Sequence, residues 1–227
     1  MKLRLQKYIR DQTGVSRRKA EELISAGLVT VGGKQADLGM SVDDVSDVVE
    51  LNGEKLGGKK KLVYIMMNKP SGFICSRSDP HNPKTVYDLL PKEYSNLFPI
   101  GRLDIDTEGL LMLTNDGDFS YKLTHPKFEV EKEYYVLING KLGLAEQREI
   151  EKGIKTPDLT TSPARIKILR STPRETSLSM IIHEGQNREI KRIFAHFGYK
   201  VAYLKRIRVA NYELGDLPTG QYVKLTV

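Results

Sequence analysis

The first fifty residues alternate between apolar spacings typical of helices and of strands. Apolar residues at helical spacing predict a first helix over residues 3–12. Ser16 is a suitable N-cap for a second helix over residues 17–26. Continuous apolar runs then predict strands over residues 28–31 and 47–51. These elements predict a small α/β module.

The longer region that follows combines buried strands with a late helix. Apolar runs predict strands over residues 62–67 and 110–114, and a further strand is expected over residues 132–138. In residues 187–197, apolar positions at i, i+3, i+4 and i+7 predict a helix with one core-facing stripe, and Asn187 is its expected N-cap. Alternating strands and few long helices favour a sheet-based domain.

Residues 53–61 separate the two regions. They contain two adjacent glycines and three consecutive lysines without an apolar period, which predicts a linker. We therefore expect one domain over residues 1–58 and a larger domain over residues 62–227.

Composition excludes several classes of protein. The chain has 227 residues, of which 39% are hydrophobic, enough for a packed core, and no run approaches the roughly 18 apolar residues of a membrane span. The N-terminus lacks the apolar core of a secretory signal. Cys75 is the only cysteine and the four histidines are scattered, so neither a disulfide framework nor a metal site is expected. We expect a cytoplasmic protein without a membrane partner.

Positive charge is concentrated in two distant stretches. The net charge is +7, which fits a polyanionic partner but equally fits a merely basic enzyme. Residues 1–35 carry eight Lys or Arg against three acids, and residues 184–208 carry seven against two. Residues 36–61 are acidic, with four basic side chains against six acids. This segregation favours two contact regions for phosphates.

Three consecutive cations open the predicted second helix. Arg17, Arg18 and Lys19 lie in its first turn, where the helix dipole prefers acids. A bound phosphate would turn this unfavourable arrangement into a binding site. The alternative is three solvated side chains.

Acidic residues cluster after residue 100. Asp104, Asp106 and Glu108 follow Arg102 in a turn that leads into the strand over residues 110–114. Such acids are able to hold a divalent cation, to hydrolyse a glycoside as a pair, or simply to stabilise a polar loop. The residues alone leave these alternatives open.

The basic side chains near the C-terminus are expected to converge. Those of the predicted helix share a face outside its apolar stripe, and those of the next strand share one side by the two-residue period of a strand. The basic residues are Arg188, Lys191 and Arg192 in the helix, and Arg206 and Arg208 in the strand, with Leu204 expected on the same side of that strand. Two independent periodicities therefore favour a surface that faces phosphates.

Several ordered motifs resemble known families. Residues 5–8, 16–24 and 27–31 together resemble the S4 RNA-binding domain. The motifs Gly101-Arg102-Leu103-Asp104, Thr107-Glu108-Gly109-Leu110-Leu111, Lys132-Glu133-Tyr134, Glu184-Gly185-Gln186-Asn187-Arg188 and Leu204-Lys205-Arg206 occur in the order typical of the RsuA/RluB family of pseudouridine synthases. This resemblance covers essentially the whole chain.

The resemblance implies an α+β fold and an RNA-modifying activity. The fold would be an S4-like α/β module followed by a catalytic domain with a mixed, mostly antiparallel sheet. The activity would be site-specific isomerisation of uridine to pseudouridine in ribosomal RNA or a pre-ribosomal particle, without cofactor or metal. The Asn187-Arg188-Glu189 variant favours the large-subunit branch over the small-subunit branch. We expect a monomer. The alternative from another class is a non-catalytic S4-type ribosome-assembly protein.

The resemblance also assigns site residues. Asp104 matches the essential aspartate, Tyr134 the tyrosine that packs on the target base, and Lys191 the cation that pairs with the aspartate. Leu204 would line the pocket and Arg102 would help to orient the flipped base. Whether Asp104 attacks carbon or removes a proton stays open. The expected RNA contacts are Arg4, Lys7, Arg17, Arg18, Lys19, Arg188, Arg192, Arg206 and Arg208.

Some nearby residues are expected to be structural. Tyr135 neighbours Tyr134 but should point to the opposite face of its strand. His125 precedes a proline and is expected to support a turn. Asp106 and Glu108 are expected to hold their loop through hydrogen bonds.

Overall fold

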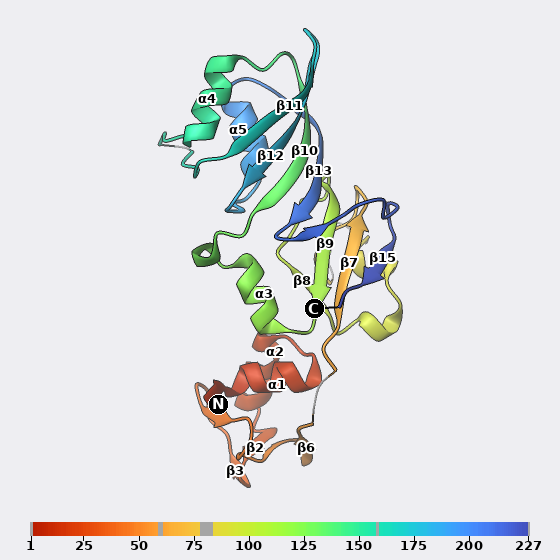
Figure 1. Ribbon diagram of the computed structural model, residues 1–227. Helices are drawn as coiled ribbons and strands as arrows, with labels where there is room; N and C mark the ends of the chain where they lie inside the picture. Colours follow the sequence, from red (N-terminus) through yellow and green to blue (C-terminus); the bar gives the residue numbers. More distant parts are fainter. Residues whose placement is uncertain (1, 59–60, 78–83, 158, 227) are drawn as a thin grey trace. The chain divides into compact units, whose positions relative to one another are not determined.

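The chain forms two compact units. The computed structural model describes residues 2–58, 61–77, 84–157 and 159–226. One unit comprises the described part of Met1–Val63 with two short later segments, Asn96–Phe98 and Thr114–Gly117. The other contains the rest of the described chain (Figure 1). No helix in the described ranges is long and apolar enough to cross a bilayer.

The first unit combines two helices with short strands. A two-stranded and a four-stranded sheet are present, the latter in the order β3-β2-β5-β6. The elements are β1 (Lys2–Arg4), α1 (Leu5–Thr13), α2 (Arg17–Ser25), β2 (Val29–Val31), β3 (Lys34–Gln35), β4 (Ser41–Asp43), β5 (Val49–Leu51) and β6 (Glu54–Leu56).

The expected second helix of this unit is confirmed. Ser16 Oγ accepts a hydrogen bond from Lys19 N at 3.0 Å and caps the helix as predicted. Gly27 follows the helix with a positive φ of 71°, the conformation that ends many helices. Apolar side chains from both helices, Leu5, Ile9 and Ile24 among them, are fully or almost fully buried in one core.

Two predictions for the first unit are wrong in detail. The first helix begins at Leu5, because Lys2–Arg4 pairs with β4 as a short strand. The expected linker over residues 53–61 contains strand β6, which pairs with β5 across a turn at Asn52 and Gly53. Its residues 59 and 60 lie outside the described residues.

The second unit is built on a large mixed sheet. Its strands are ordered β11-β12-β10-β13-β9-β7-β15. The elements are β7 (Tyr64–Lys69), η1 (Val86–Leu89), η2 (Lys92–Tyr94), β8 (Phe98–Ile100), β9 (Glu108–Thr114), α3 (Gly117–Thr124), η3 (Pro126–Phe128), β10 (Lys132–Asn139), α4 (Leu144–Lys152), β11 (Arg165–Ser171), β12 (Glu175–Ile182), α5 (Glu189–His196), β13 (Val201–Val209), β14 (Tyr212–Glu213) and β15 (Tyr222–Lys224).

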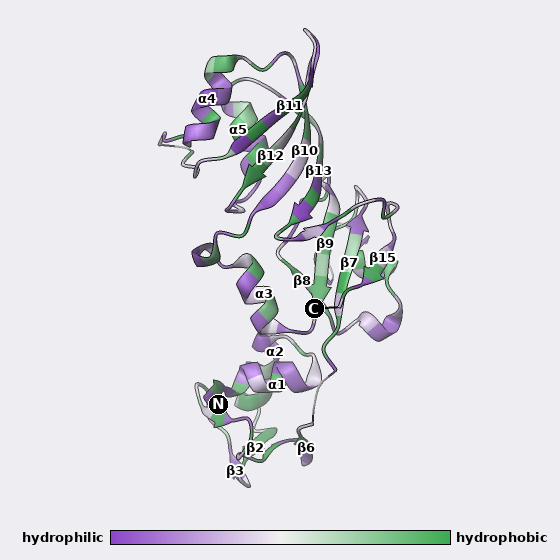
Figure 2. Cartoon of the chain, in the orientation of Figure 1, coloured by the Kyte–Doolittle hydropathy of each residue, from purple (hydrophilic) through white to green (hydrophobic). Residues whose placement is uncertain are grey.

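The expected α+β class with a mostly antiparallel sheet is confirmed. The pairs β11–β12, β12–β10 and β10–β13 are antiparallel, whereas β13 pairs with β9 in parallel. Helices α4 and α5 lie against β11 and β13 (Figure 1). Strand β9 is mostly hydrophobic, whereas β7 ends in hydrophilic residues (Figure 2), although the side chains of both strands are almost completely buried.

The parallel junction between β9 and β13 requires a glycine. Gly109 pairs with Arg206 and has a φ of 102°. A Cβ at this position would lie 2.1 Å from the carbonyl oxygen of Arg206. The two backbones therefore approach more closely than any other residue allows.

A β-bulge separates the basic residues of β13. Tyr134 pairs with Arg206, but the adjacent Glu133 pairs with Arg208, so Ile207 is an extra residue on β13. Neighbours on β10 project to opposite faces of the sheet, and cross-strand partners share a face. The expectation that Arg206 and Arg208 share one side is therefore wrong.

Helix α5 begins later than its pattern predicts. Arg188, not Asn187, precedes the first helical residue, and it has a left-handed φ of 50° without a side-chain cap. The predicted apolar stripe is confirmed, since Ile190, Ile193 and Phe194 are buried.

Candidate active site

A cavity of about 350 Å³ lies in the second unit. The loop before β9, strands β10 and β13, and the start of α5 form its walls. Seven of the residues singled out in the sequence line it: Arg102, Asp104, Tyr134, Arg188, Lys191, Leu204 and Arg206. The fold thus gathers side chains that are up to about one hundred residues apart in the chain.

Lys191 lies between two carboxylates of the loop before β9. Its Nζ is 3.4 Å from Asp104 Oδ2 and also contacts Asp106 Oδ1. Partial burial alone would raise the pKa of Asp106, but the hydrogen bond and charge of Lys191 outweigh it and lower that pKa. The expected pairing of Lys191 with Asp104 is present. Asp106 was expected only to support its own loop. Its contact with the same lysine was not predicted.

A buried lysine supports the backbone of this loop. Lys69, at the end of β7, has no exposed surface. Its Nζ donates to the carbonyl oxygens of Pro70, Asp104, Ile105 and Thr107, at 3.0, 3.1, 3.3 and 2.9 Å respectively. Burial lowers the pKa of Lys69. Lys69 was not among the predicted site residues, although a lysine at the end of a buried apolar strand, directly before a proline, was a usable signal.

Tyr134, Leu204 and Arg206 form the sheet wall of the cavity. Each is less than a tenth exposed. Arg206 donates from Nε to the carbonyl oxygen of Leu110 at 2.8 Å, which fixes its guanidinium beside β9. An aromatic ring and an aliphatic side chain beside a carboxylate suit a planar, uncharged ring that enters next to Asp104.

Lys132, which belongs to a motif quoted above but was given no role there, is a further cation in the wall. Its Nζ donates to the carbonyl oxygens of Val130 and His183, at 2.9 and 3.2 Å. Burial lowers the pKa of Lys132. The signal was its place two residues before Tyr134, since alternate residues of a strand share a face.

Glu189 brings an unusual carboxyl group to the same cavity. It is 4% exposed and accepts a hydrogen bond from Gln186 N at 2.9 Å. Burial raises the pKa of Glu189 to about 7. Nearby Glu184 has a lowered pKa, because its hydrogen bonds with Gln186 and Ser162 outweigh the opposing effect of partial burial. The two carboxyl groups therefore ionise at different pH values.

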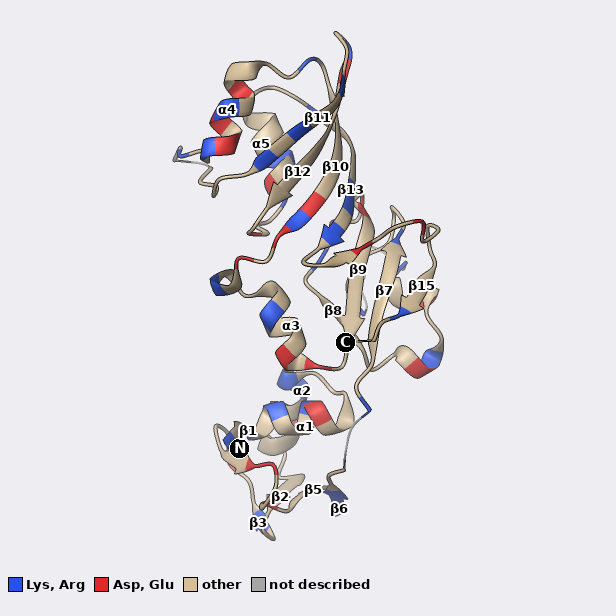
Figure 3. Ribbon diagram, viewed as in Figure 1, with Lys and Arg blue, Asp and Glu red and all other residues tan. Residues whose placement is uncertain are grey.

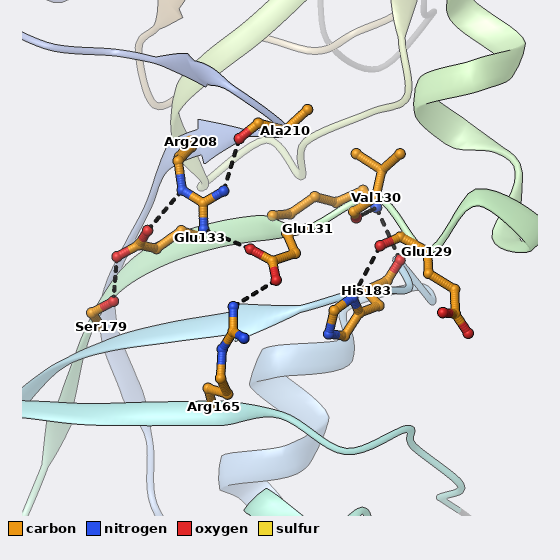
Figure 4. Close-up of polar contacts among 10 residues, drawn as sticks. Glu129, Val130, Glu131, Glu133, Arg165, Ser179, His183, Arg208 and Ala210 are labelled. Carbon is orange, nitrogen blue, oxygen red and sulfur yellow. Dashed lines mark hydrogen bonds and ion pairs between the residues drawn. The ribbon is translucent and has the colours of Figure 1, made fainter.

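Arg192 and Arg208 do not line the cavity. Arg208 is on the far face of the sheet, bound to Glu131 and Glu133 (Figure 4). These acids occupy Nε and Nη2 of its guanidinium in the structure.

The basic side chains of the first unit include several exposed groups. Lys and Arg are conspicuous on α1 and α2 (Figure 3). Arg17 and Arg18 are exposed, and so is Lys19, which pairs with Glu22 at 2.9 Å. Arg4 donates to the carbonyl oxygen of Gly39. Lys7 is half-buried.

Two residues expected to be structural behave that way. His125 caps the turn η3 by accepting a hydrogen bond from Lys127 N at 3.2 Å. Tyr135 lies on the opposite face from Tyr134 and packs edge-on against Tyr203, with ring centroids 6.0 Å apart. Glu108 accepts a hydrogen bond from the Tyr203 hydroxyl at 2.7 Å.

Comparison with known proteins identifies the family. A model of the RNA pseudouridylate synthase family matches residues 63–196, and a model of the S4 domain matches residues 3–49. The chain belongs to the RNA pseudouridine synthase family. As a member, it is an isomerase with an N-terminal S4 domain, which confirms the resemblance seen in the sequence.

Pseudouridine synthases of similar length resemble this one along its whole chain. It is 42% identical to ribosomal large subunit pseudouridine synthase B of Bacillus subtilis, over 98% of this chain and 92% of the relative. An uncharacterized RNA pseudouridine synthase of Aquifex aeolicus is 36% identical, over 99% and 91%. A crystal structure of a pseudouridylate synthase, 30% identical, superposes with a TM-score of 0.72 over 99% of this chain and 96% of that one.

Across the described residues, no group of three or more His, Cys, Asp or Glu side chains is placed to hold a metal ion. Asp104 and Asp106 instead meet the ammonium of Lys191.

Proposed function

We propose that this synthase isomerises uridine in ribosomal RNA, with Asp104 as the nucleophile or base. The observation that carries the proposal is the convergence of Asp104, Tyr134 and Leu204 on one cavity, with Lys191 Nζ 3.4 Å from the Asp104 carboxylate. Large-subunit rRNA is the favoured substrate, because the B. subtilis relative is named for the large ribosomal subunit.

The proposed chemistry matches the groups in the cavity. The N1–C1′ bond of uridine breaks and a C5–C1′ bond forms, while a proton leaves C5 and N1 gains one. The reaction changes neither the composition nor the oxidation state of the nucleotide. A carboxylate next to C1′ and C2′ serves either as nucleophile or as base. The ammonium of Lys191 stabilises the negative charge of that carboxylate.

The base has to leave the RNA stack to reach Asp104. The ring of Tyr134 offers a face for the flipped uracil, and Leu204 closes the side of the pocket. We assign Arg102 and Arg188, which are exposed and line the cavity, to the adjacent phosphates. Arg206 is buried in the wall and would contact only the inserted nucleotide.

We assign the S4 domain to docking of the RNA. Its exposed cations at the first turn of α2 combine with the helix dipole to attract phosphate. Lys7 and Arg192 remain proposed contacts, whereas Arg4 is engaged with Gly39.

Transcribed rRNA of each subunit, labelled with tritium at C5 of uridine, tests the function. Isomerisation releases the tritium, and chemical mapping then identifies the modified nucleotide. We expect release from the large-subunit RNA and its loss in Asp104→Asn. Asp216→Asn, at an exposed position, is the matched control. Full activity of Asp104→Asn would refute its assignment, and no release from either RNA would refute the function.

A further inference from the structure

On the face opposite the cavity, ion pairs and hydrogen bonds of Arg208 hold the strand that carries Tyr134. Arg208 donates from Nη2 to Glu131 Oε2 and from Nε to Glu133 Oε2, each at 3.0 Å. Its Nη1 donates to the carbonyl oxygen of Ala210 at 2.8 Å (Figure 4). All three guanidinium nitrogens are therefore occupied, and two of them hold the segment around Lys132.

The network continues across the sheet to its edge. Glu133 Oε1 accepts a hydrogen bond from Ser179 Oγ of β12, and Glu131 Oε1 accepts one from Arg165 Nη2 of β11, each at 2.6 Å (Figure 4). Arg208 is at its centre, with 19% of its side chain exposed, whereas Arg165 is 63% exposed at the periphery. The central ion pairs are better shielded from water and salt than the peripheral one.

Sequence alternation connects this network to the cavity. Glu131 and Glu133 alternate with Lys132 and Tyr134, and successive side chains of a strand point to opposite faces. Holding the two acids on the far face therefore holds Lys132 and Tyr134 on the cavity face. A slip by one residue would turn the tyrosine away from the cavity.

The bulge at Ile207 makes this arrangement possible. Without the extra residue, Arg208 would share the face of Arg206 and could not reach Glu133. The hydrogen bond from Arg208 lowers the pKa of Glu131, and those from Ser179 and Arg208 lower the pKa of Glu133. Both acids are consequently ionised at neutral pH and attract the guanidinium.

We propose that Arg208 is a positioning residue, which acts through Glu131 and Glu133 to set where Tyr134 meets the flipped base. This inference rests on the proposed function and takes the place of the phosphate contact expected for Arg208 from the sequence.

Four variants test it: Arg208→Gln, Arg208→Lys, Glu133→Gln and the double variant of Arg208→Gln with Glu133→Gln. We expect Arg208→Gln to lower kcat about 10- to 100-fold, the range that follows from a small misplacement of a contact group. KM, RNA affinity and its salt dependence should stay unchanged. Arg208→Lys should be intermediate, since one ammonium does not replace a fork that binds both acids. The double variant should match Arg208→Gln, because both changes break the same contact between Arg208 and Glu133.

Arg165→Gln is the matched control, since it removes an exposed partner of Glu131 and should leave kcat unchanged. Lower RNA affinity with a smaller salt slope in Arg208→Gln, at unchanged kcat, would identify a phosphate contact and overturn the proposal. A lower melting temperature of Arg208→Gln, with an unchanged kcat of the folded variant, would also overturn the proposal.

A spectroscopic readout separates this inference from the proposed function. The chain has eleven tyrosines, so 3-fluorotyrosine labelling yields a ¹⁹F spectrum in which Tyr134→Phe assigns the relevant signal. We expect Arg208→Gln and Glu133→Gln to shift or broaden that signal and Arg165→Gln to leave it in place. An unmoved signal in Arg208→Gln would refute positioning even if no uridine substrate were found. Loss of tritium release in the wild type alone would refute only the function.

Discussion

The contribution of Lys69 to the active-site loop can be measured by its replacement with methionine. Methionine fills a similar volume but donates no hydrogen bond. Two of the four carbonyl oxygens keep another donor, because Thr107 N also binds the Asp104 oxygen at 3.1 Å and Gly72 N binds the Ile105 oxygen at 2.8 Å. Within the described residues, the carbonyl oxygens of Pro70 and Thr107 depend on Lys69.

The magnitude follows from these two acceptors. Each buried polar group that loses its partner costs about 1–3 kcal/mol. Relief from burying an ammonium, whose cost is visible in the lowered pKa of Lys69, offsets part of this loss. We expect Lys69→Met to lower the free energy of unfolding by about 2–4 kcal/mol. Since Asp104 is in the loop that Lys69 supports, kcat should fall by about 100-fold.

Urea unfolding measures the first effect, and tritium release at saturating RNA measures the second. Lys152→Met, at an exposed position at the end of α4, is the control for loss of a lysine. If Lys69→Met unfolds at the same urea concentration as the wild type and keeps its kcat, the loop is held by other contacts and the reasoning fails.

Three further predictions concern other parts of the protein. Glu189→Gln should stabilise the protein by about 3 kcal/mol at pH 8 and by little at pH 4.5. The reason is that native Glu189 holds its proton up to a pKa of about 7, above the ordinary 4.5, so the stability of the wild type falls as pH rises through that interval. If urea unfolding gives the same difference in stability between variant and wild type at both pH values, this prediction is contradicted. Arg17→Gln with Arg18→Gln should reduce the salt slope of RNA binding by about 0.7–0.9 per lost phosphate contact without changing kcat; an unchanged slope would exclude these side chains from the interface. Gly109→Ala should destabilise the fold by about 2–5 kcal/mol, since its Cβ would meet the Arg206 carbonyl at a strained φ. If the variant unfolds at the same temperature as the wild type, β9 and β13 move apart to accommodate the Cβ at no cost and the prediction is wrong.

Local patterns predicted part of the regular structure, whereas α3, α4, β11 and β12 were not predicted. The helix after Ser16 and the apolar stripe of α5 follow directly from side-chain spacing and capping, which are local properties. The same holds for the buried β9, although it begins at Glu108 rather than residue 110, because pairing with β13 extends it.

Non-local contacts limited the prediction of the site. Lys69 was missed because its partners are carbonyl oxygens some 35 residues away, which leave no trace in side-chain pattern. The period-two rule failed at Arg208 because a bulge is decided by the partner strand. The short strand Lys2–Arg4 was missed for the same reason, since β4 provides its pairing. The family resemblance located Asp104, Tyr134 and Lys191, which charge and periodicity alone left among several alternatives.

The parallel pairing of β9 with β13 has a consequence for how the enzyme is made. Asp104 and Lys191 are separated by 87 residues. Strand β9 can pair with β13 at Gly109 only after Arg206 has been synthesised. During translation, the aspartate loop therefore emerges long before the residues that complete its surroundings. Chains that end before β13 should be catalytically silent, and the high sequence separation of these contacts should make folding of the catalytic unit slow relative to that of the S4 domain.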